Sequence, residues 1–290
     1  MRWNISFNTV FELGQRSGQE DCIYPAAGAS DPGNGLFIVC DGMGGHDKGE
    51  VASQAVCKAM SDYVNAHAHA DGSFSENDFK AALSAAYDAL DALDDGAVRK
   101  MGTTMTFLKF HKDGCMLAHI GDSRIYHIRP SLPEGKRIMH VTRDHSLVND
   151  LIAIGEMTPQ EAKTSSQRNV ITRAMQPCQE RRSRADIQNI SDVRPGDIFY
   201  MCTDGMLEKT EDSEIEVLLS DANMTGAQKT AVLIEQTRNN KDNHSAVIVS
   251  VGGSAVEASA PAELPYTMLW VLAGVMFLMS LVCFYFAMTL

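Results

Sequence analysis

The chain has 290 residues, of which 44% are hydrophobic and 21% charged, an ordinary balance for a globular protein. A chain of this length can bury a substantial core without disulfide cross-links. The formal net charge of −12 argues against a nucleic-acid partner, because phosphate backbones are bound by clustered Lys and Arg. The acidic balance fits a protein that gathers carboxylates around metal ions, but many soluble proteins are acidic without doing so.

The first part of the chain contains two strand patterns followed by two helix patterns. Residues 3–13 partly alternate apolar and polar side chains, as a strand does. Residues 36–40 form a short apolar run that ends at an Asp-Gly pair, as a buried strand would. Residues 50–64 and 75–93 have helical spacing, and Ser75 is a suitable residue to cap the second helix.

Four strands are predicted in the middle of the chain. Residues 103–110 and 115–120 are strand-like, and the Lys-Asp-Gly sequence at 112–114 between them predicts a hairpin. Residues 124–128 and 138–142 continue the strand pattern. Such a run of consecutive strands favours antiparallel pairing over strict alternation with helices.

The second half of the chain begins with helical patterns. Residues 147–154 have helical spacing, and Thr158 to Glu161 reads as a capping box with Pro at the first helical position. Further elements are expected in this order: strands at 184–190 and 198–202, helices at 214–219 and 226–237, and a strand at 246–251. The grouping of strands and helices predicts an α+β domain of antiparallel sheets with helices packed outside.

The C-terminal end differs from the rest of the chain. Residues 266–290 contain no charged residue and no histidine, and as a helix they would be about 37 Å long at ~1.5 Å per residue. That length spans a hydrocarbon core of about 30 Å, so we predict a transmembrane helix. The predicted organisation is therefore a folded domain at 1–252, a linker rich in Ala, Ser and Glu at 253–265, and a membrane anchor at 266–290.

The orientation of this anchor is predicted from the order of the segments. The N-terminal residues lack the apolar stretch and the cleavage site of a secretory signal, and the large domain precedes the anchor. We therefore expect a single-pass membrane protein with its folded domain in the cytoplasm.

Carboxylates recur beside the predicted strands. Asp41, Asp122 and Asp204 each follow a predicted strand, Asp242 lies just before one, and the Glu20-Asp21 pair completes the set. Strand ends present side chains to a shared cleft, and carboxylates brought together repel unless cations neutralise them. Oxygen ligands favour Mg²⁺ or Mn²⁺, and two such ions can activate a water. A single Asp-Gly pair is more often just a turn, so the pattern alone only suggests a metal site.

Seven short motifs occur in a fixed order along the chain. They are Arg16-Ser-Gly-Gln-Glu-Asp21, Asp41-Gly-Met-Gly-Gly-His46, Gly102-Thr-Thr104, Gly121-Asp-Ser-Arg124, Thr142-Arg-Asp-His-Ser146, Asp204-Gly205 and Asp242-Asn243. In this combination, over roughly residues 5–251, the chain resembles the bacterial members of the type 2C family of metal-dependent serine/threonine protein phosphatases. The resemblance implies a four-layer α-β-β-α sandwich of two antiparallel sheets flanked by helices, with two Mn²⁺ or Mg²⁺ ions in a cleft at one end.

The resemblance also implies roles for individual residues. Asp41 would bridge both ions, and the carbonyl of Gly42 would join it as a ligand. The two-ion site would be completed by Asp21, Asp204 and Asp242. Asp122 would hold a third, weaker ion. Arg16 would hold the substrate phosphate, for which a guanidinium fork is well shaped. Residues 147–169 would form a mobile flap that shapes substrate access.

The implied reaction is hydrolysis of phosphoserine and phosphothreonine in proteins by a metal-activated water. The substrates would be phosphoproteins made by a cognate bacterial Ser/Thr kinase. Animal members of the family have a histidine where this chain has Met43, so the proton donor to the leaving oxygen stays open between His46 and water. Three rivals are a membrane-tethered phosphoprotein-binding module with weak or no turnover, a hydrolase of small phosphoesters, and a structural part of a membrane complex.

Overall fold

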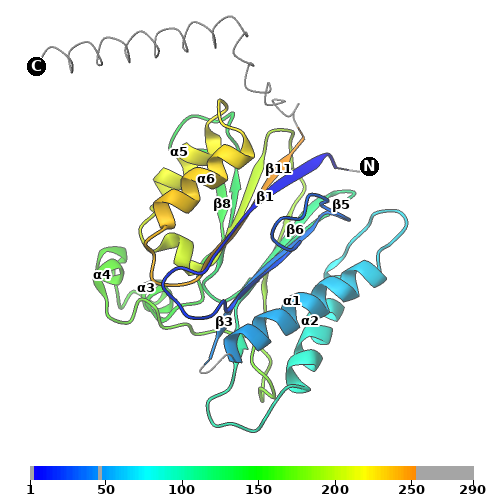
Figure 1. The fold of residues 1–290 in the computed structure, drawn as a ribbon, viewed down its shortest axis with the longest axis vertical. Helices are drawn as coiled ribbons and strands as arrows, with labels where there is room; N and C mark the ends of the chain where they lie inside the picture. Colours follow the sequence, from blue (N-terminus) through cyan, green and yellow to red (C-terminus); the bar gives the residue numbers. More distant parts are fainter. Residues whose placement is uncertain (1–2, 45–47, 253–290) are drawn as a thin grey trace, which may run out of the picture. The chain divides into compact units, whose positions relative to one another are not determined.

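The computed structural model of the chain describes residues 3–44 and 48–252, which fold around two β-sheets (Figure 1). The first sheet contains, in spatial order, β1 (Ile5–Glu12), β11 (His244–Val251), β10 (Ile198–Cys202), β7 (Arg124–Ile128) and β8 (Ile138–Val141). The second contains β2 (Asp21–Tyr24), β3 (Leu36–Met43), β5 (Met105–His111), β6 (Gly114–Ile120) and β9 (Asp186–Ile190), and the short β4 (Gly102–Thr103) pairs with β3. All of these pairings are antiparallel.

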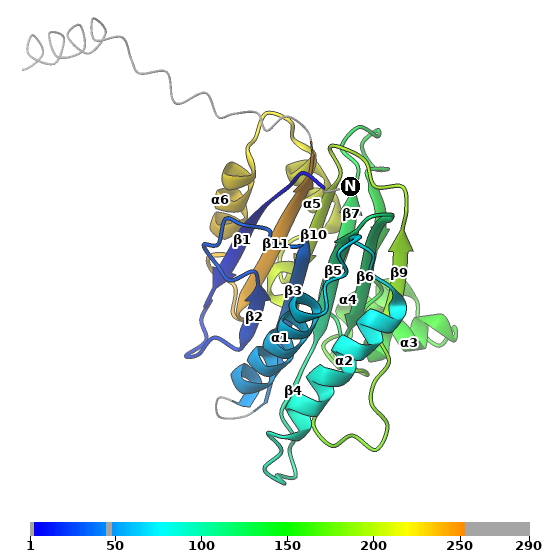
Figure 2. The same ribbon diagram turned by 90° about the vertical axis from the view of Figure 1, so that its right-hand side faces the viewer.

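Helices cover the outer faces of both sheets. The second sheet packs against α1 (Lys48–Ala66) and α2 (Glu76–Asp91), and the first against α5 (Asp212–Ser220) and α6 (Gly226–Thr237). Figure 2 shows α1 and α2 lying across the strands of the second sheet. The predicted α+β class and the four-layer order of helices, sheet, sheet and helices are confirmed.

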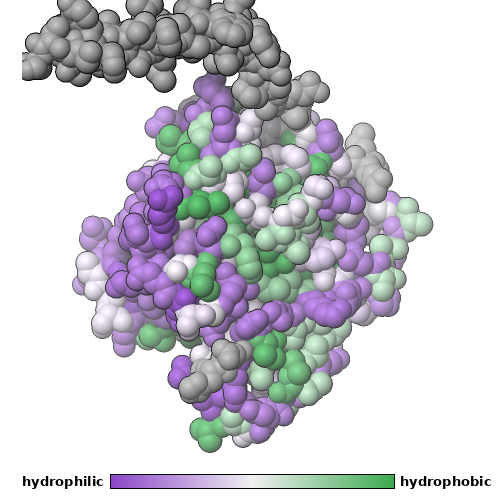
Figure 3. Space-filling view, viewed as in Figure 1, coloured by the Kyte–Doolittle hydropathy of each residue, from purple (hydrophilic) through white to green (hydrophobic). Residues whose placement is uncertain are grey.

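The core between the two sheets explains why several strands read as continuous apolar runs. Phe37, Phe110 and Phe199 are buried there, and the ring of Phe110 meets those of Phe37 and Phe199 edge-on at centroid distances of 6.4 and 5.4 Å. A strand covered by a sheet on one face and helices on the other is apolar on both faces. Seen as in Figure 1, hydrophobic colour is concentrated in the strip between the helical layers (Figure 3).

The structure adds elements that the sequence patterns did not reveal. β2 and β4 have four and two residues, which is too short for a periodic pattern. A 3-10 turn, η1, at Asp204–Leu207 was not predicted either, whereas the two short helices of the predicted flap, α3 (Leu147–Ala153) and α4 (Pro159–Thr164), lie where helical patterns were predicted. The predicted cap at Ser75 and the predicted capping box at Thr158 are both present, and Ser75 also forms a capping box, with Asp78.

The predicted anchor cannot be compared with the structure. Residues 253–265 and 266–290 lie outside the described residues, so the linker and the transmembrane helix stay predictions. Among the helices that the structure does describe, none combines the length and the apolar character that crossing a membrane requires.

The inter-sheet core gives a prediction about stability. Replacing the fully buried Phe199 with Ala should lower the free energy of unfolding by about 3–5 kcal/mol, because the cavity left between the sheets cannot close. The measurement is urea unfolding of the full chain. Val217→Ala, at a side chain that is 49% exposed on α5, is the control and should change stability by less than about 0.5 kcal/mol. Equal effects of the two substitutions would contradict this view of the core.

Candidate metal centre

The five predicted carboxylates come from both sheets and meet at one end of the sandwich. Asp21 opens β2 and lies opposite Asp41 of β3 in the antiparallel pair. Asp122 and Asp204 each follow a strand, β6 and β10, after one intervening residue, and Asp242 stands two residues before β11. Asp41 interacts electrostatically with all four of the others. The structure therefore brings together every aspartate that the sequence nominated.

This crowding changes the acidity of the carboxyl groups. Burial, together with repulsion from Asp21 and Asp204, raises the pKa of Asp41 well above its usual range. Burial raises the pKa of Asp21 to about 7, and it does the same for Asp122. Burial and the charge of Asp242 raise the pKa of Asp204. A neighbouring cation would reverse these shifts, because an opposite charge favours the ionised carboxylate.

Unpaired oxygen atoms in the cluster support a fit to hard cations. Asp21 Oδ1 and Asp122 Oδ1 are buried and have no hydrogen-bond partner within the described part of the chain. Buried carboxylates are normally paired or bound to metal ions. The clustered side chains offer only oxygen atoms, which Mn²⁺ and Mg²⁺ prefer over softer ligands. The residues present therefore fit such ions.

The backbone of Asp41 is fixed by the Gly-Thr-Thr motif, a role that the sequence analysis did not assign. Thr104 Oγ1 accepts a hydrogen bond from the Asp41 amide at 2.9 Å, and the Asp41 carbonyl accepts from Thr103 Oγ1 and from the Thr104 amide, each at 2.9 Å. Thr104 Oγ1 also lies 2.8 Å from the hydroxyl of Ser123, the residue after Asp122. Two of the carboxylates are thus held in register by buried hydroxyls.

Gly42 stands where no side chain fits. A Cβ at this position would lie 2.2 Å from the carbonyl oxygen of Gly49 and 2.4 Å from that of Glu20. The absence of a side chain lets the start of α1 and the residue before Asp21 approach β3 closely. This explains the Asp-Gly pair sterically, while the expected role of the Gly42 carbonyl as a ligand stays a prediction.

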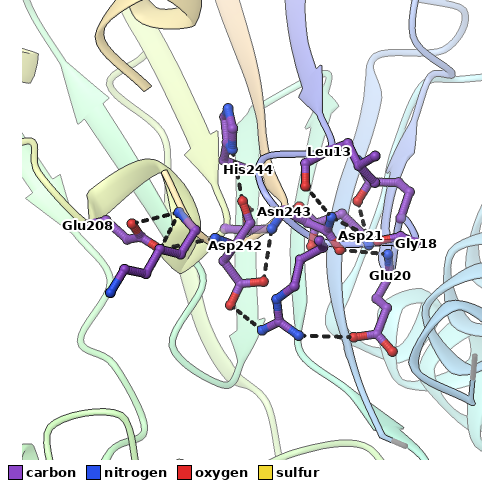
Figure 4. Close-up of polar contacts among 12 residues, drawn as sticks. Leu13, Gly18, Glu20, Asp21, Glu208, Asp242, Asn243 and His244 are labelled. Atoms are coloured by element: carbon purple, nitrogen blue, oxygen red, sulfur yellow. Dashed lines mark hydrogen bonds and ion pairs between the residues drawn. The ribbon is translucent and has the colours of Figure 1, made fainter. Parts of the chain in front are cut away.

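Asn243 ties the loop between β1 and β2 to the cluster (Figure 4). Its side-chain amide donates to the carbonyls of Leu13 at 2.8 Å and Gly18 at 3.0 Å, and its Oδ1 accepts from the Glu20 amide at 2.8 Å. One side chain therefore closes the loop that leads into Asp21. Its place in the motif with Asp242 was recognised in the sequence, but its contacts across more than 220 residues were not.

Arg16 lies in that loop, at the edge of the cluster. Its Nη2 is 2.6 Å from Asp242 Oδ2, and its Nη1 is 3.9 Å from Glu20 Oε2. The side chain is 50% exposed, so the guanidinium is held on one side and open to solvent on the other. The ion pair with Asp242 was not foreseen, because nothing in the local sequence links the two residues.

The two ends of the predicted flap, residues 147–169, are held close together. Ser146 and Ile171 form an antiparallel bridge, and the Leu147 amide donates to the Val170 carbonyl at 2.8 Å. His46, the candidate proton donor, lies outside the described residues.

A second group of potential metal ligands, His119, His145 and Asp186, lies at the base of the flap. His145 Nδ1 accepts the Gly121 amide proton at 3.1 Å, and its Nε2 lies 3.2 Å from Asp186 Oδ2 and 3.1 Å from Arg173 Nη1. The Arg173 guanidinium donates to the other oxygen of Asp186 at 2.9 Å. His119 Nε2 lies 2.9 Å from the Arg143 carbonyl, so both histidines already have hydrogen-bond partners, and we interpret this group as a hydrogen-bonded support.

Comparison with known proteins agrees with this arrangement. The family model described as protein phosphatase 2C matches residues 20–241. Protein phosphatase PhpP of Streptococcus pneumoniae is 32% identical over 228 residues, covering 78% of this chain and 89% of that protein. Serine/threonine protein phosphatase PstP of Mycobacterium tuberculosis is 31% identical over 242 residues, covering 81% of this chain and 43% of PstP.

Solved structures extend the likeness to the whole sandwich. The Streptococcus agalactiae serine/threonine phosphatase superimposes with a TM-score of 0.69 at 28% identity, over 86% of this chain and all of that one. The catalytic domain of PstP, solved in complex with two manganese ions, gives a TM-score of 0.65 at 28% identity, again over 86% of this chain and all of that domain. The chain therefore belongs to the protein phosphatase 2C family of metal-dependent serine/threonine phosphatases.

Proposed function

We propose that Asp21, Asp41, Asp204 and Asp242 hold the two Mn²⁺ or Mg²⁺ ions that this phosphatase uses, with Asp122 available for a third. The observation that carries the proposal is the convergence of five aspartates, four of which are disfavoured as ions by burial and by repulsion unless a cation is present. When bound, the ions supply an activated water for attack on phosphorus and offset charge on the phosphate.

The protein's own groups then position the substrate and the proton. The Arg16 guanidinium, oriented by Asp242, has further N–H groups available for the phosphate oxygens. The flap between Ser146 and Ile171 borders the path by which a protein substrate reaches the cleft. His46 is the proposed proton donor to the leaving serine or threonine oxygen, with water as the alternative. The substrates in this proposal are phosphoproteins made by a cognate Ser/Thr kinase.

Substitution of the central aspartates tests the proposed ligands. Asp41→Asn and Asp204→Asn should each lower Mn²⁺-dependent hydrolysis of a phosphothreonine peptide by more than about 100-fold, since even outer-shell changes at metal sites cost about 10–100-fold. Asp62→Asn, at an exposed carboxylate paired with Lys58 on α1, is the control and should retain full activity. Normal turnover by either cleft variant would rule out the assigned site. A nucleotide assayed beside the peptide separates protein phosphatase activity from hydrolysis of small phosphoesters.

Loss of the Arg16 side chain should weaken binding of the substrate phosphate more than binding of the metal ions. Arg16→Ala is expected to raise the KM for the phosphothreonine peptide at saturating Mn²⁺ by about tenfold, as loss of a charge-assisted hydrogen bond predicts. The Mn²⁺ concentration for half-maximal activity should change less. Arg16→Lys keeps the charge but not the forked guanidinium, so its KM should lie between that of the parent protein and that of Arg16→Ala. An unchanged KM in Arg16→Ala would refute the role in substrate binding.

We also propose that residues 266–290 anchor the chain in a membrane as a single pass. Support comes from the length and the absence of charge in this segment. A double variant, Leu278→Lys with Leu281→Lys, should abolish membrane association that resists alkaline extraction, because each lysine costs about 2.5–3.5 kcal/mol near the centre of a spanning helix. Leu278→Ile with Leu281→Ile is the matched control. If the lysine variant stays in the extracted membrane fraction, the proposed anchor is wrong.

The cytoplasmic orientation of the domain needs its own measurement. Protease added to intact cells should leave the phosphatase domain uncut, whereas the same protease should digest it after lysis. Digestion in intact cells would reverse the proposed orientation.

A further inference from the structure

A cavity of about 720 Å³ lies at the end of the sandwich opposite the aspartates. Its wall includes Asn34, just before β3 begins, and Lys109 and His111, at the end of β5. Asp41 lies near the other end of β3, and the intervening residues at ~3.3 Å each separate the two sites by about 20 Å. The cavity is therefore not part of the catalytic cleft.

Lys109 is a buried cation without a counter-charge. Its side chain is 8% exposed, and its ammonium group donates to the carbonyls of Asn34 at 2.5 Å and Phe110 at 3.1 Å. No carboxylate forms an ion pair with it within the described residues, and burial lowers its pKa to about 8. Lysines are rarely buried unless they are paired, and the third N–H of this ammonium is left for another acceptor.

His111 adds a second N–H group without an acceptor, on the same face of β5 as Lys109. It follows Lys109 by two residues, so both side chains point to the side of the sheet covered by α1 and α2. Its Nδ1 accepts the Asp113 amide proton at 3.2 Å, which places the ring proton on Nε2. This Nε2 is buried and has no hydrogen-bond partner in the described part of the chain.

The rest of the wall suits a flat apolar body. The Phe74 ring lies on the same side of the sheet as Lys109, with its centroid 6.0 Å from the ammonium group, whereas the rings of Trp3 and Phe110, 6.0 Å apart, belong to the edge of the core between the sheets. The acidic groups that also line the cavity already have partners. Asp71 pairs with Lys112 at 2.6 Å, and Asp31 accepts the Gly33 amide proton at 2.8 Å. Of the two lysines that line the cavity, Lys109 is therefore the one that no carboxylate pairs with in the described part of the chain.

We propose that this cavity binds a small carboxylate with an aromatic body, its carboxylate paired with Lys109 and His111 and its ring against Phe74. The ligand would supply the counter-charge that Lys109 lacks and an acceptor for His111 Nε2. A buried water could accept the same two hydrogen bonds, but it would not offset the charge of Lys109.

The test is a binding titration on the full chain carrying Trp270→Phe, which leaves Trp3 as its sole tryptophan. Benzoate and a series of larger aryl carboxylates are the probes, and benzamide is the neutral match for benzoate. A carboxylate should change Trp3 fluorescence saturably and raise the Tm by several degrees, while benzamide should do neither.

Two variants make the result specific. Lys109→Met should abolish the carboxylate effect while retaining metal-dependent hydrolysis of p-nitrophenyl phosphate, which reports that the domain is folded. Lys58→Met, the same change at an exposed lysine of α1, should bind as the parent does. If Lys109→Met does not fold, His111→Leu takes its place and should weaken binding at least tenfold.

Three outcomes would overturn the proposal. They are the absence of a saturable effect with every carboxylate, an equal effect of benzamide, and unchanged binding by the lysine or histidine variant. Any of them would mean that the cavity holds water only or takes up aromatic compounds non-specifically.

Discussion

Mutual repulsion among buried aspartates is the constraint on which the rest of this molecule depends. Asp41 interacts with four other carboxylates, and burial adds to the free energy needed to ionise Asp41, Asp21, Asp122 and Asp204. Such an arrangement is stable only if the scaffold holds the groups in place and cations offset their charge. The two sheets provide that scaffold, because strands from both of them end at the same place.

The aspartates are positioned mainly by neutral groups that do not take part in the chemistry. Thr104 fixes the backbone of Asp41, and Thr203 Oγ1 donates to Asp21 Oδ2 at 3.1 Å. Asn243 closes the loop that leads to Asp21. Hydroxyl and amide groups can do this without adding charge to a site that already has too much of one sign. The motifs around each aspartate are therefore structural as much as catalytic.

Sequence patterns predicted the class of the fold, and they picked out the aspartates that the structure brings together. What they predicted depends on residues close to one another in the chain. Periodicity and capping are local, so the helix at Gly226–Thr237 and the caps at Ser75 and Thr158 were found. Pairings between distant residues were not, because Arg16 and Asp242 are 226 positions apart. The unpaired charge of Lys109 was equally hidden, since a lysine within an apolar strand reveals its burial only once the layers are assembled.

An isolated bridge closes the base of the flap. Ser146 pairs with Ile171, so the segment between them begins and ends at nearly the same point of the domain. A loop whose ends already meet can lengthen or shorten at little entropic cost, and none of the five aspartates lies within it. Under the proposed role of this segment in substrate access, its length could therefore differ between enzymes that accept different proteins, while the aspartates keep their positions.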